Sequence, residues 1–253
     1  MKRKPKFGQN FLVDRAWQKR IVEAFRPDAA FAEIGYGEGA LTNLLLERFK
    51  FFVVFEIDES LIAKANLSHE FKMIHLDFLK WDFHLNDQRV ENFSLISNLP
   101  YESSTAILLR VIERADQIEH FVFMFQREVA DRILARPKSR TYGALSVLAQ
   151  GQYQLESLGI LKPGAFKPPP KVDSTVIRAF RRKDPHPREE VYRNFIFKAF
   201  SQKRKILKNA LKQEFLAEKI QQVFSSLGLS DNIRAEEIGL EDWPKLFYKF
   251  YER

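Results

Sequence analysis

The chain has 253 residues, of which 45% are hydrophobic and 29% charged, so a packed core is available and global disorder is excluded. Cysteine is absent, which excludes a disulfide framework, a thiolate metal site and a cysteine nucleophile. The formal net charge is +8, and it is concentrated, because residues 1–20 carry a net of +6 and residues 181–213 a net of +8. Two basic segments of this kind favour a polyanionic partner, and a merely solvated surface is the alternative.

The predicted elements alternate between strand and helix through the first 180 residues. Apolar residues recur at helical spacing over 12–26 until Pro27 ends the helix. The apolar run 51–55 is typical of a strand buried on both faces of a parallel sheet. In chain order we expect strands at 31–34, 51–55, 73–75, 93–97 and 120–125, helices at 12–26, 40–49, 59–67, 103–114, 127–135 and 141–150, and a closing strand pair at 152–160 and 172–180.

This alternation predicts an α/β fold, a Rossmann-like, doubly wound and mostly parallel sheet with helices on both faces. The polar, proline-containing stretch 181–187 is expected to be a linker. Beyond it, 188–253 is predicted to be wholly helical and too small for a comfortable core of its own. We therefore expect two domains, a sheet domain over 1–180 and a small helical domain over 188–253. No apolar run approaches the roughly 20 residues of a membrane span, and the N-terminus lacks the apolar stretch of a signal peptide, so we expect a soluble, cytoplasmic protein.

A glycine-rich turn, 33–39, leaves the first strand of this sheet and opens a helix. Open α/β sheets bind ligands at this end of their strands, and glycines permit positive φ and a close approach by a ligand. Glu56 ends the next strand, where a carboxylate suits ribose hydroxyls, and Asp77 ends the third, where it can accept from an adenine amino group. Each feature alone is also compatible with an ordinary tight turn or a surface carboxylate.

The glycine spacing distinguishes two kinds of ligand. A dinucleotide-binding turn has Gly-x-Gly-x-x-Gly, whereas this chain has Gly-x-Gly-x-Gly with Glu33 two residues upstream of Gly35. S-adenosyl-L-methionine has no pyrophosphate to bind and carries a sulfonium and an ammonium, which carboxylates suit. The spacing therefore favours S-adenosylmethionine.

Asn98-Leu99-Pro100-Tyr101 follows the fourth strand and indicates the chemistry. An exocyclic amine of adenine is a poor nucleophile because its lone pair is delocalised into the ring. An Asn oxygen and a backbone carbonyl can accept both N–H bonds and so direct the lone pair at a methyl group. Pro100 stiffens the loop, and Tyr101 offers a face for base stacking. Neither a metal nor a strong general base is required, because the sulfonium is already activated.

With these motifs, the chain resembles the ribosomal RNA adenine dimethyltransferase family, KsgA type, over nearly its whole length. Any single motif is weak evidence, whereas all of them in order are specific. The segments at 168–174 and 199–205 favour the KsgA type over the related Erm antibiotic-resistance methyltransferases. The family usually has proline where Tyr36 lies and asparagine where Glu102 lies. The matching segments are 7–12, 33–39, 56–58, Asp77, 98–101, 125–130, 142–147, 168–174 and 199–205.

The resemblance implies S-adenosylmethionine-dependent dimethylation of the exocyclic amines of two adjacent adenosines. These would lie in a hairpin loop near the 3′ end of 16S ribosomal RNA, in the small ribosomal subunit or its precursor. We expect a monomer with no metal and no membrane partner. The implied cofactor contacts are Asn10, Leu12, Gly35, Glu56, Asp77 and Asn98, to which we add Gly37, Ile57 and Phe78; Asn98, Leu99, Pro100 and Tyr101 form the implied catalytic loop.

Two further predictions concern RNA. Phe166 lies among turn formers and lysines, so we expect its ring to be exposed and to stack on the target base beside Tyr101. Lys203, Arg204, Lys205 and Lys208 are expected to form a stripe along one helix that contacts RNA phosphates.

We expect the basic N-terminal segment to be flexible and to fold over the cofactor site.

Three other functions remain open at this stage. An Erm-like enzyme would act on large-subunit RNA. A non-catalytic nucleic-acid-binding relative, such as a mitochondrial transcription factor built on this fold, would still bind RNA or DNA, although the intact 98–101 motif argues against lost catalysis. A nicotinamide oxidoreductase is disfavoured by the glycine spacing.

Overall fold

The computed structural model describes residues 9–27, 30–65, 70–85, 88–89, 91–202 and 205–251. The predicted arrangement of residues 1–8 and of Lys203 and Arg204 therefore lies outside the described residues. The described chain forms two compact units: one comprises the residues up to Ala130 together with Leu155–Arg181, and the other Asp131–Gln154 together with the residues from Arg182 onward. The stretch 131–154 thus groups with the C-terminal helices, while the predicted division at 180 and 188 stays a proposal about functional domains.

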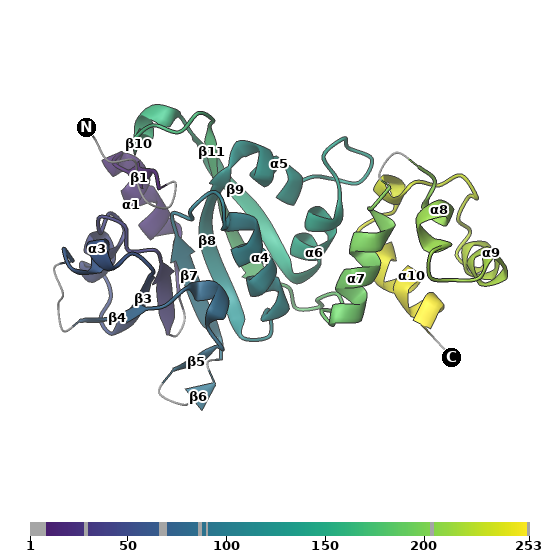
Figure 1. The fold of residues 1–253 in the computed structure, drawn as a ribbon, viewed down its shortest axis with the longest axis horizontal. Helices are drawn as coiled ribbons and strands as arrows, with labels where there is room; N and C mark the ends of the chain where they lie inside the picture. The colour runs from purple at the N-terminus through teal and green to yellow at the C-terminus, as the bar shows by residue number, and fades with distance from the viewer. Residues whose placement is uncertain are drawn as a thin grey trace. The chain divides into compact units, whose positions relative to one another are not determined.

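The first unit is built on a seven-stranded sheet with the strand order β4-β3-β2-β7-β8-β11-β9 (Figure 1). Five neighbouring strands are parallel and β11 runs antiparallel to β8, which confirms the predicted fold class. The strand order reverses at β2, because the chain continues to β3 and β4 on one side and returns to β7 and β8 on the other. The strands are β2 (Phe31–Ile34), β3 (Phe52–Glu56), β4 (Phe71–His75), β7 (Phe93–Ser97), β8 (Ile118–Gln126), β9 (Tyr153–Leu161) and β11 (Ser174–Arg181).

Helices cover both faces of this sheet. Successive side chains of a strand point to opposite faces, so the buried strands direct apolar side chains to helices on each side. On one face, Phe31 and Phe52 belong to a core with side chains of α1 (Arg15–Ala24) and α2 (Thr42–Leu46). On the other, the Phe55 ring lies 4.9 Å from the Trp81 ring, and Arg110 of α4 (Ser104–Glu113) donates to the Trp81 carbonyl at 3.0 Å. Figure 1 shows α4 lying over the sheet. The shorter α3 is Glu59–Ile62, and a 3₁₀ turn spans Phe78–Lys80.

The N-terminal segment is attached to this unit by a short strand pair. β1 (Phe11–Leu12) runs antiparallel to β10 (Phe166–Lys167). Gln18 donates to the Leu12 carbonyl at 2.7 Å, and Val13 N–H donates to Ala165 at 2.8 Å. Residues 9–12 are therefore held beside the carboxyl ends of the parallel strands. A second small hairpin pairs β5 (His84–Leu85) with β6 (Gln88–Arg89).

The second unit is helical and has an aromatic core. The Phe195 ring lies 6.4 Å from Trp243 and 5.9 Å from Phe250. Of the stretch 181–187, predicted to be a linker, Arg181 ends β11. The rest is anchored within this unit, because Arg182 and His186 donate their backbone N–H groups to the Gln152 and Gly151 carbonyls. Its elements are α6 (Ala144–Gln152), α7 (Glu190–Ala199), α8 (Leu207–Leu211), α9 (Ala217–Ser226), a 3₁₀ turn (Ala235–Glu237) and α10 (Asp242–Tyr251), while α5 (Arg127–Ile133) begins in the first unit.

None of the helices in the part of the chain that the structure describes has both the length and the apolar character needed to cross a bilayer.

Candidate active site

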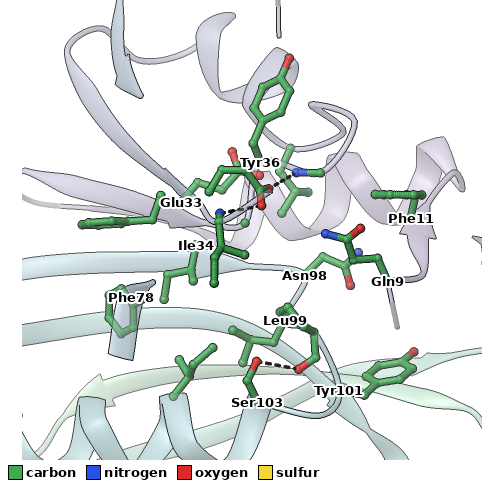
Figure 2. Close-up of a pocket in the computed structure, with 18 of the residues that line it drawn as sticks. Gln9, Phe11, Glu33, Ile34, Tyr36, Phe78, Asn98, Leu99, Tyr101 and Ser103 are labelled. Carbon is green, nitrogen blue, oxygen red and sulfur yellow. Dashed lines mark hydrogen bonds between the residues drawn. The ribbon is translucent and has the colours of Figure 1, made fainter. Parts of the chain in front are cut away.

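A cavity of about 250 Å³ opens at the carboxyl ends of β2, β3, β4 and β7, all within the first unit (Figure 2). Carboxyl ends at the point where a strand order reverses are the usual ligand site of open α/β sheets. The cavity brings together every residue predicted to contact the cofactor, and the predicted catalytic loop as well. These residues are Asn10, Leu12, Gly35, Gly37, Glu56, Ile57, Asp77, Phe78, Asn98, Leu99, Pro100 and Tyr101.

The glycine-rich turn needs glycine for its conformation and for space. Gly35, Gly37 and Gly39 have φ values of +81°, +58° and +77°, a region that side chains with a Cβ rarely adopt. A Cβ on Gly37 would also lie 3.3 Å from a ring carbon of Phe11, which packs over the turn. The turn therefore presents bare backbone to the cavity and to the N-terminal segment. Tyr36, at the position where the family usually has proline, is buried with its ring stacked 6.5 Å from Phe71.

Glu56 connects this turn to the end of β3. Its Oε2 accepts from Gly37 N–H at 3.0 Å, and its Oε1 accepts from Ile57 and Asp58 N–H at 2.8 and 2.9 Å. A carboxylate has about four lone-pair sites, so three bonds leave capacity for a ligand hydroxyl. The bond to Gly37 was not expected from the sequence, because spacing alone gives no signal for it.

Glu33 is a second carboxyl group that lines the cavity, and it is 2% exposed. Burial raises its pKa to about 8; the bond from Thr42 Oγ1, at 2.5 Å, opposes this rise, and the neighbouring Glu56 adds to it. Near neutral pH the Glu33 carboxyl is therefore largely protonated, and a cation in the cavity would favour its ionised form. In the sequence, Glu33 stands out only as the acidic residue two positions upstream of Gly35.

The third strand end contributes Asp77 and Phe78. Asp77 Oδ1 accepts from Leu79 N–H at 3.0 Å and so caps the 3₁₀ turn. Phe78 is 3% exposed, and its ring packs against Phe55 at 5.6 Å. Phe78 thus reaches the cavity from the edge of the aromatic core, and Asp77 stands at its rim.

Asn98 follows β7 and is oriented by the N-terminal segment. Its Nδ2 donates to the Asn10 carbonyl at 3.0 Å. A carbonyl oxygen can only accept, so the amide nitrogen is the atom that faces Asn10, and Oδ1 is left to accept from a ligand. Figure 2 shows Asn98 between Tyr36 and Tyr101, close to Gln9.

Tyr101 is half-buried at the other end of this loop. Its hydroxyl lies 2.6 Å from Ser174 Oγ, and Ser104 Oγ donates to its carbonyl at 3.0 Å. Burial raises the pKa of Tyr101, against the opposing effect of the Ser174 bond. Glu102, where the family usually has asparagine, is exposed and lines the cavity.

The expectation that Phe166 is exposed is wrong. The residue is 3% exposed and belongs to the same core as Leu12. β10 pairs with β1, so that Phe166 stands opposite Leu12 and its ring is directed into the unit. In this conformation the ring offers no face for base stacking.

The predicted basic stripe does not lie on one helix. α7 ends at Ala199 and α8 begins at Leu207, so Lys205 precedes the helix that contains Lys208. Lys205 is exposed. Lys208 Nζ lies 2.6 Å from Asp231 Oδ1 and donates to Gln221 at 2.8 Å, and its side chain is 16% exposed. The charge of Lys208 is therefore already paired within its own unit.

The donor and acceptor set of the cavity fits S-adenosylmethionine. Glu33, Glu56 and Asp77 place carboxyl groups at the cavity, which suit a ligand with hydroxyl, amino and cationic groups, and the glycine turn offers backbone where a Cβ would obstruct. Among the described residues, no group of three or more His, Asp or Glu side chains is arranged to hold a metal ion.

Comparisons with known proteins match the chain to one family. The family model for ribosomal RNA adenine dimethylase matches residues 1–251. Two relatives named ribosomal RNA small subunit methyltransferase A come from Nitrosospira multiformis and Clostridium acetobutylicum. They are 36% and 35% identical to this chain and cover 94% and 97% of it, and 92% and 93% of their own lengths.

Solved structures show the same fold. A dimethyladenosine transferase from Plasmodium falciparum is 22% identical, with a TM-score of 0.83 over 96% of this chain and 98% of its own. The 23S rRNA methyltransferase ErmE is 25% identical, with a TM-score of 0.68 over 96% of this chain and 100% of its own.

Proposed function

The chain belongs to the ribosomal RNA adenine dimethylase family, and from this premise we propose how its cavity performs the reaction. The protein is an S-adenosylmethionine-dependent methyltransferase that dimethylates the exocyclic amines of adenosines in 16S ribosomal RNA. Its target is two adjacent adenosines in a hairpin loop near the 3′ end, and its substrate is the small ribosomal subunit or a precursor. The enzyme acts as a monomer, in the cytoplasm, during small-subunit maturation.

The cofactor site is formed by the turn 35–39 and the three strand ends that surround it. S-adenosylmethionine supplies a methyl group on a positively charged sulfur, which makes it an activated donor. Glu56 holds the ribose hydroxyls with the lone-pair capacity that its three backbone bonds leave. Asp77 accepts from the adenine amino group, and Glu33 balances the positive charge of the ligand.

Asn98 is the residue that prepares the target amine. The observation that carries this proposal is the bond from its Nδ2 to the Asn10 carbonyl, which leaves Oδ1 to accept an N–H of the adenine amine. The loop carbonyl at Leu99 or Pro100 accepts the other N–H, and Tyr101 stacks on the base. These two hydrogen bonds draw the hydrogens of the amine out of the plane of the adenine ring. The lone pair of the nitrogen then points toward the methyl group. The contribution is one of alignment, which acts on the rate of methyl transfer.

The preference for the small subunit rests on the relatives. Those named ribosomal RNA small subunit methyltransferase A match more than nine-tenths of both chains. The likeness to ErmE, whose name specifies 23S rRNA, is at lower identity. An enzyme acting on large-subunit RNA is therefore the alternative outcome of the test.

The test uses small and large ribosomal subunits from cells that lack this modification. Each is incubated with the protein and S-adenosylmethionine labelled in its methyl group, and the labelled nucleotide is mapped in the RNA. We expect label at the exocyclic amines of two adjacent adenosines of the small-subunit RNA, four methyl groups per RNA at completion. Label confined to large-subunit RNA would overturn the small-subunit proposal, and absence of label in both would overturn the catalytic one.

A further inference from the structure

The hydroxyl of Tyr101 meets a buried serine that lies 73 residues further along the chain. The Tyr101 Oη and Ser174 Oγ atoms are 2.6 Å apart. Ser174 is 0% exposed. A hydroxyl pair this close in a site without full access to water is a strong directional contact.

Ser174 is a rigid anchor because of its place in the sheet. It is the first residue of β11, and β11 pairs with β8 in register from Ser174 opposite Gln126 to Phe180 opposite His120. Asp173, just before it, accepts from Arg127 at 3.3 Å and from Lys162 at 2.8 Å, and its carbonyl accepts from Arg127 N–H at 2.9 Å. The start of β11 is thus held by backbone and side-chain bonds together.

The other bonds of the Tyr101 loop act on its backbone. Ser104 Oγ donates to the Tyr101 carbonyl at 3.0 Å, and Ser103 Oγ donates to the Pro100 carbonyl at 3.4 Å. A half-buried tyrosine ring can still change its side-chain rotamer when its backbone is fixed. The hydroxyl bond to Ser174 removes that freedom.

We infer that Ser174 is a positioning residue that fixes the plane of the Tyr101 ring on which the target adenine stacks. The inference rests on the proposed stacking role of Tyr101. Through this bond, the edge of the sheet sets the pose of the base relative to Asn98, although Ser174 itself does not touch the substrate. A misplaced ring would lower the rate of the aligned reaction while leaving cofactor binding intact, because Ser174 is not among the residues that line the cavity.

The experiment is a double-mutant cycle on the full-length protein. Ser174→Ala, Tyr101→Phe and the double variant each remove the same hydrogen bond. Single-turnover methyl transfer to unmethylated small ribosomal subunits is measured at saturating S-adenosylmethionine, with cofactor affinity from calorimetry and the melting temperature alongside. Thr175→Val is the matched control, because Thr175 is the next residue of β11 and is also buried, at 4% exposed. Ser174→Thr retains a hydroxyl and tests rescue.

We expect each single variant to slow methyl transfer about tenfold, the value of roughly one hydrogen bond, and the double variant to be no slower than either single one. Cofactor affinity should be unchanged, Thr175→Val should retain the wild-type rate, and Ser174→Thr should recover part of the loss. Additive losses in the double variant, or a wild-type rate in Ser174→Ala, would overturn the inference.

A further variant, Tyr101→Ala, separates this inference from the function on which it depends. If Tyr101→Ala slows methyl transfer and Ser174→Ala does not, Tyr101 still acts on the base and only the role of Ser174 fails. If Tyr101→Ala has the wild-type rate, the stacking role of Tyr101 fails, and the role of Ser174 fails with it. Loss of activity in Ser174→Ala together with a lowered melting temperature, unmatched by Tyr101→Phe, would show that Ser174 is only structural.

Discussion

At the scale of single residues, the cavity contains carboxyl groups in different environments. Glu33 is buried and accepts one hydroxyl bond from Thr42; burial dominates, and its pKa rises to about 8. Glu56 is equally buried but accepts three backbone N–H bonds. Glu33 can therefore respond to a cationic ligand by ionising, while Glu56 holds the turn and the ligand together.

The role of Asn98 predicts a loss of rate in its alanine variant. Asn98→Ala should slow single-turnover methyl transfer by about 100-fold or more at saturating cofactor, because alignment is gained mainly in the transition state. Binding to the small ribosomal subunit should change much less. Asn194→Ala is the control, since Asn194 is exposed on α7. A loss of RNA binding as large as the loss of rate would contradict the orienting role.

The bonds of Glu56 predict a loss of cofactor affinity in its glutamine variant. Gln keeps the shape but has a single acceptor oxygen, so it cannot serve Gly37, Ile57 and Asp58 together with a ligand hydroxyl. We expect Glu56→Gln to weaken S-adenosylmethionine binding by about 1.5–3 kcal/mol, the value of hydrogen bonds to a charged group. Calorimetry measures this change, with the exposed Glu59→Gln as control. An unchanged affinity in a folded Glu56→Gln protein would refute the assignment.

At the scale of elements, the cavity depends on which strand ends lie side by side. β2 has β3 on one side and β7 on the other, so residues separated by more than 60 positions meet around one turn. The β1–β10 pair adds Asn10 to this group from the N-terminal side. In the helical unit, Lys205 lies in the break between α7 and α8, whereas Lys208 lies on α8 and forms an ion pair with Asp231.

This difference among the basic residues predicts different salt effects. Replacing Lys203, Arg204 and Lys205 by Gln should reduce the slope of log affinity for the small subunit against log salt by roughly 0.7–0.9 per lost phosphate contact. Lys208→Gln should change the slope much less, because its charge is paired, and it serves as the matched control. Binding measured at several salt concentrations distinguishes the two variants. Equal slopes in the triple variant and the wild type would exclude 203–205 as an RNA contact.

At the scale of the whole molecule, His120 makes stability depend on pH. It is 1% exposed on β8, between the rings of Phe25 and Phe180 at 5.3 and 4.4 Å, and neither ring nitrogen has a hydrogen-bond partner. Burial, and to a smaller extent the nearby charge of Arg178, lower its pKa to about 4. Between pH 6.5 and 4 the unfolded chain therefore binds a proton that the folded protein does not, so this contribution to stability is lost as the pH falls.

His120→Phe isolates this effect, because a Phe ring suits the same stack and cannot be protonated. The free energy of unfolding of His120→Phe minus that of the wild type should increase as the pH falls from 6.5 to 4, by up to about 1.4 kcal/mol per pH unit. Denaturant unfolding at several pH values measures it. The comparison cancels Glu33, whose raised pKa acts in the opposite direction over part of this range. A difference that is constant with pH would show that His120 is not the titrating group.

The amino-acid sequence was enough to predict where the parallel strands end and which polar residues follow them. Gly35, Glu56, Asp77 and Asn98 each follow a short apolar run, and a run of that kind is a local signal for a buried parallel strand. Because the carboxyl ends of parallel strands meet at one edge, the residues after them could be expected to converge, and all of them line one cavity. The fold class and the place of the site were predictable for this reason, while the cofactor followed from the glycine spacing and the reaction from the 98–101 motif and the family resemblance.

The contacts that hold these residues in place depend on the fold and could not be predicted. Three hydrogen bonds join segments whose contact no local sequence pattern encodes. They are the bonds of Glu56 with Gly37, of Asn98 with Asn10, and of Tyr101 with Ser174. For Phe166 the local sequence led to a wrong prediction. Its neighbours in sequence are turn formers and lysines, which predict exposure, but the pairing of β10 with β1 buries its ring. Local composition reports the tendency of a segment to be exposed, but burial depends on the partner that the fold brings to it, and that partner is distant in the sequence.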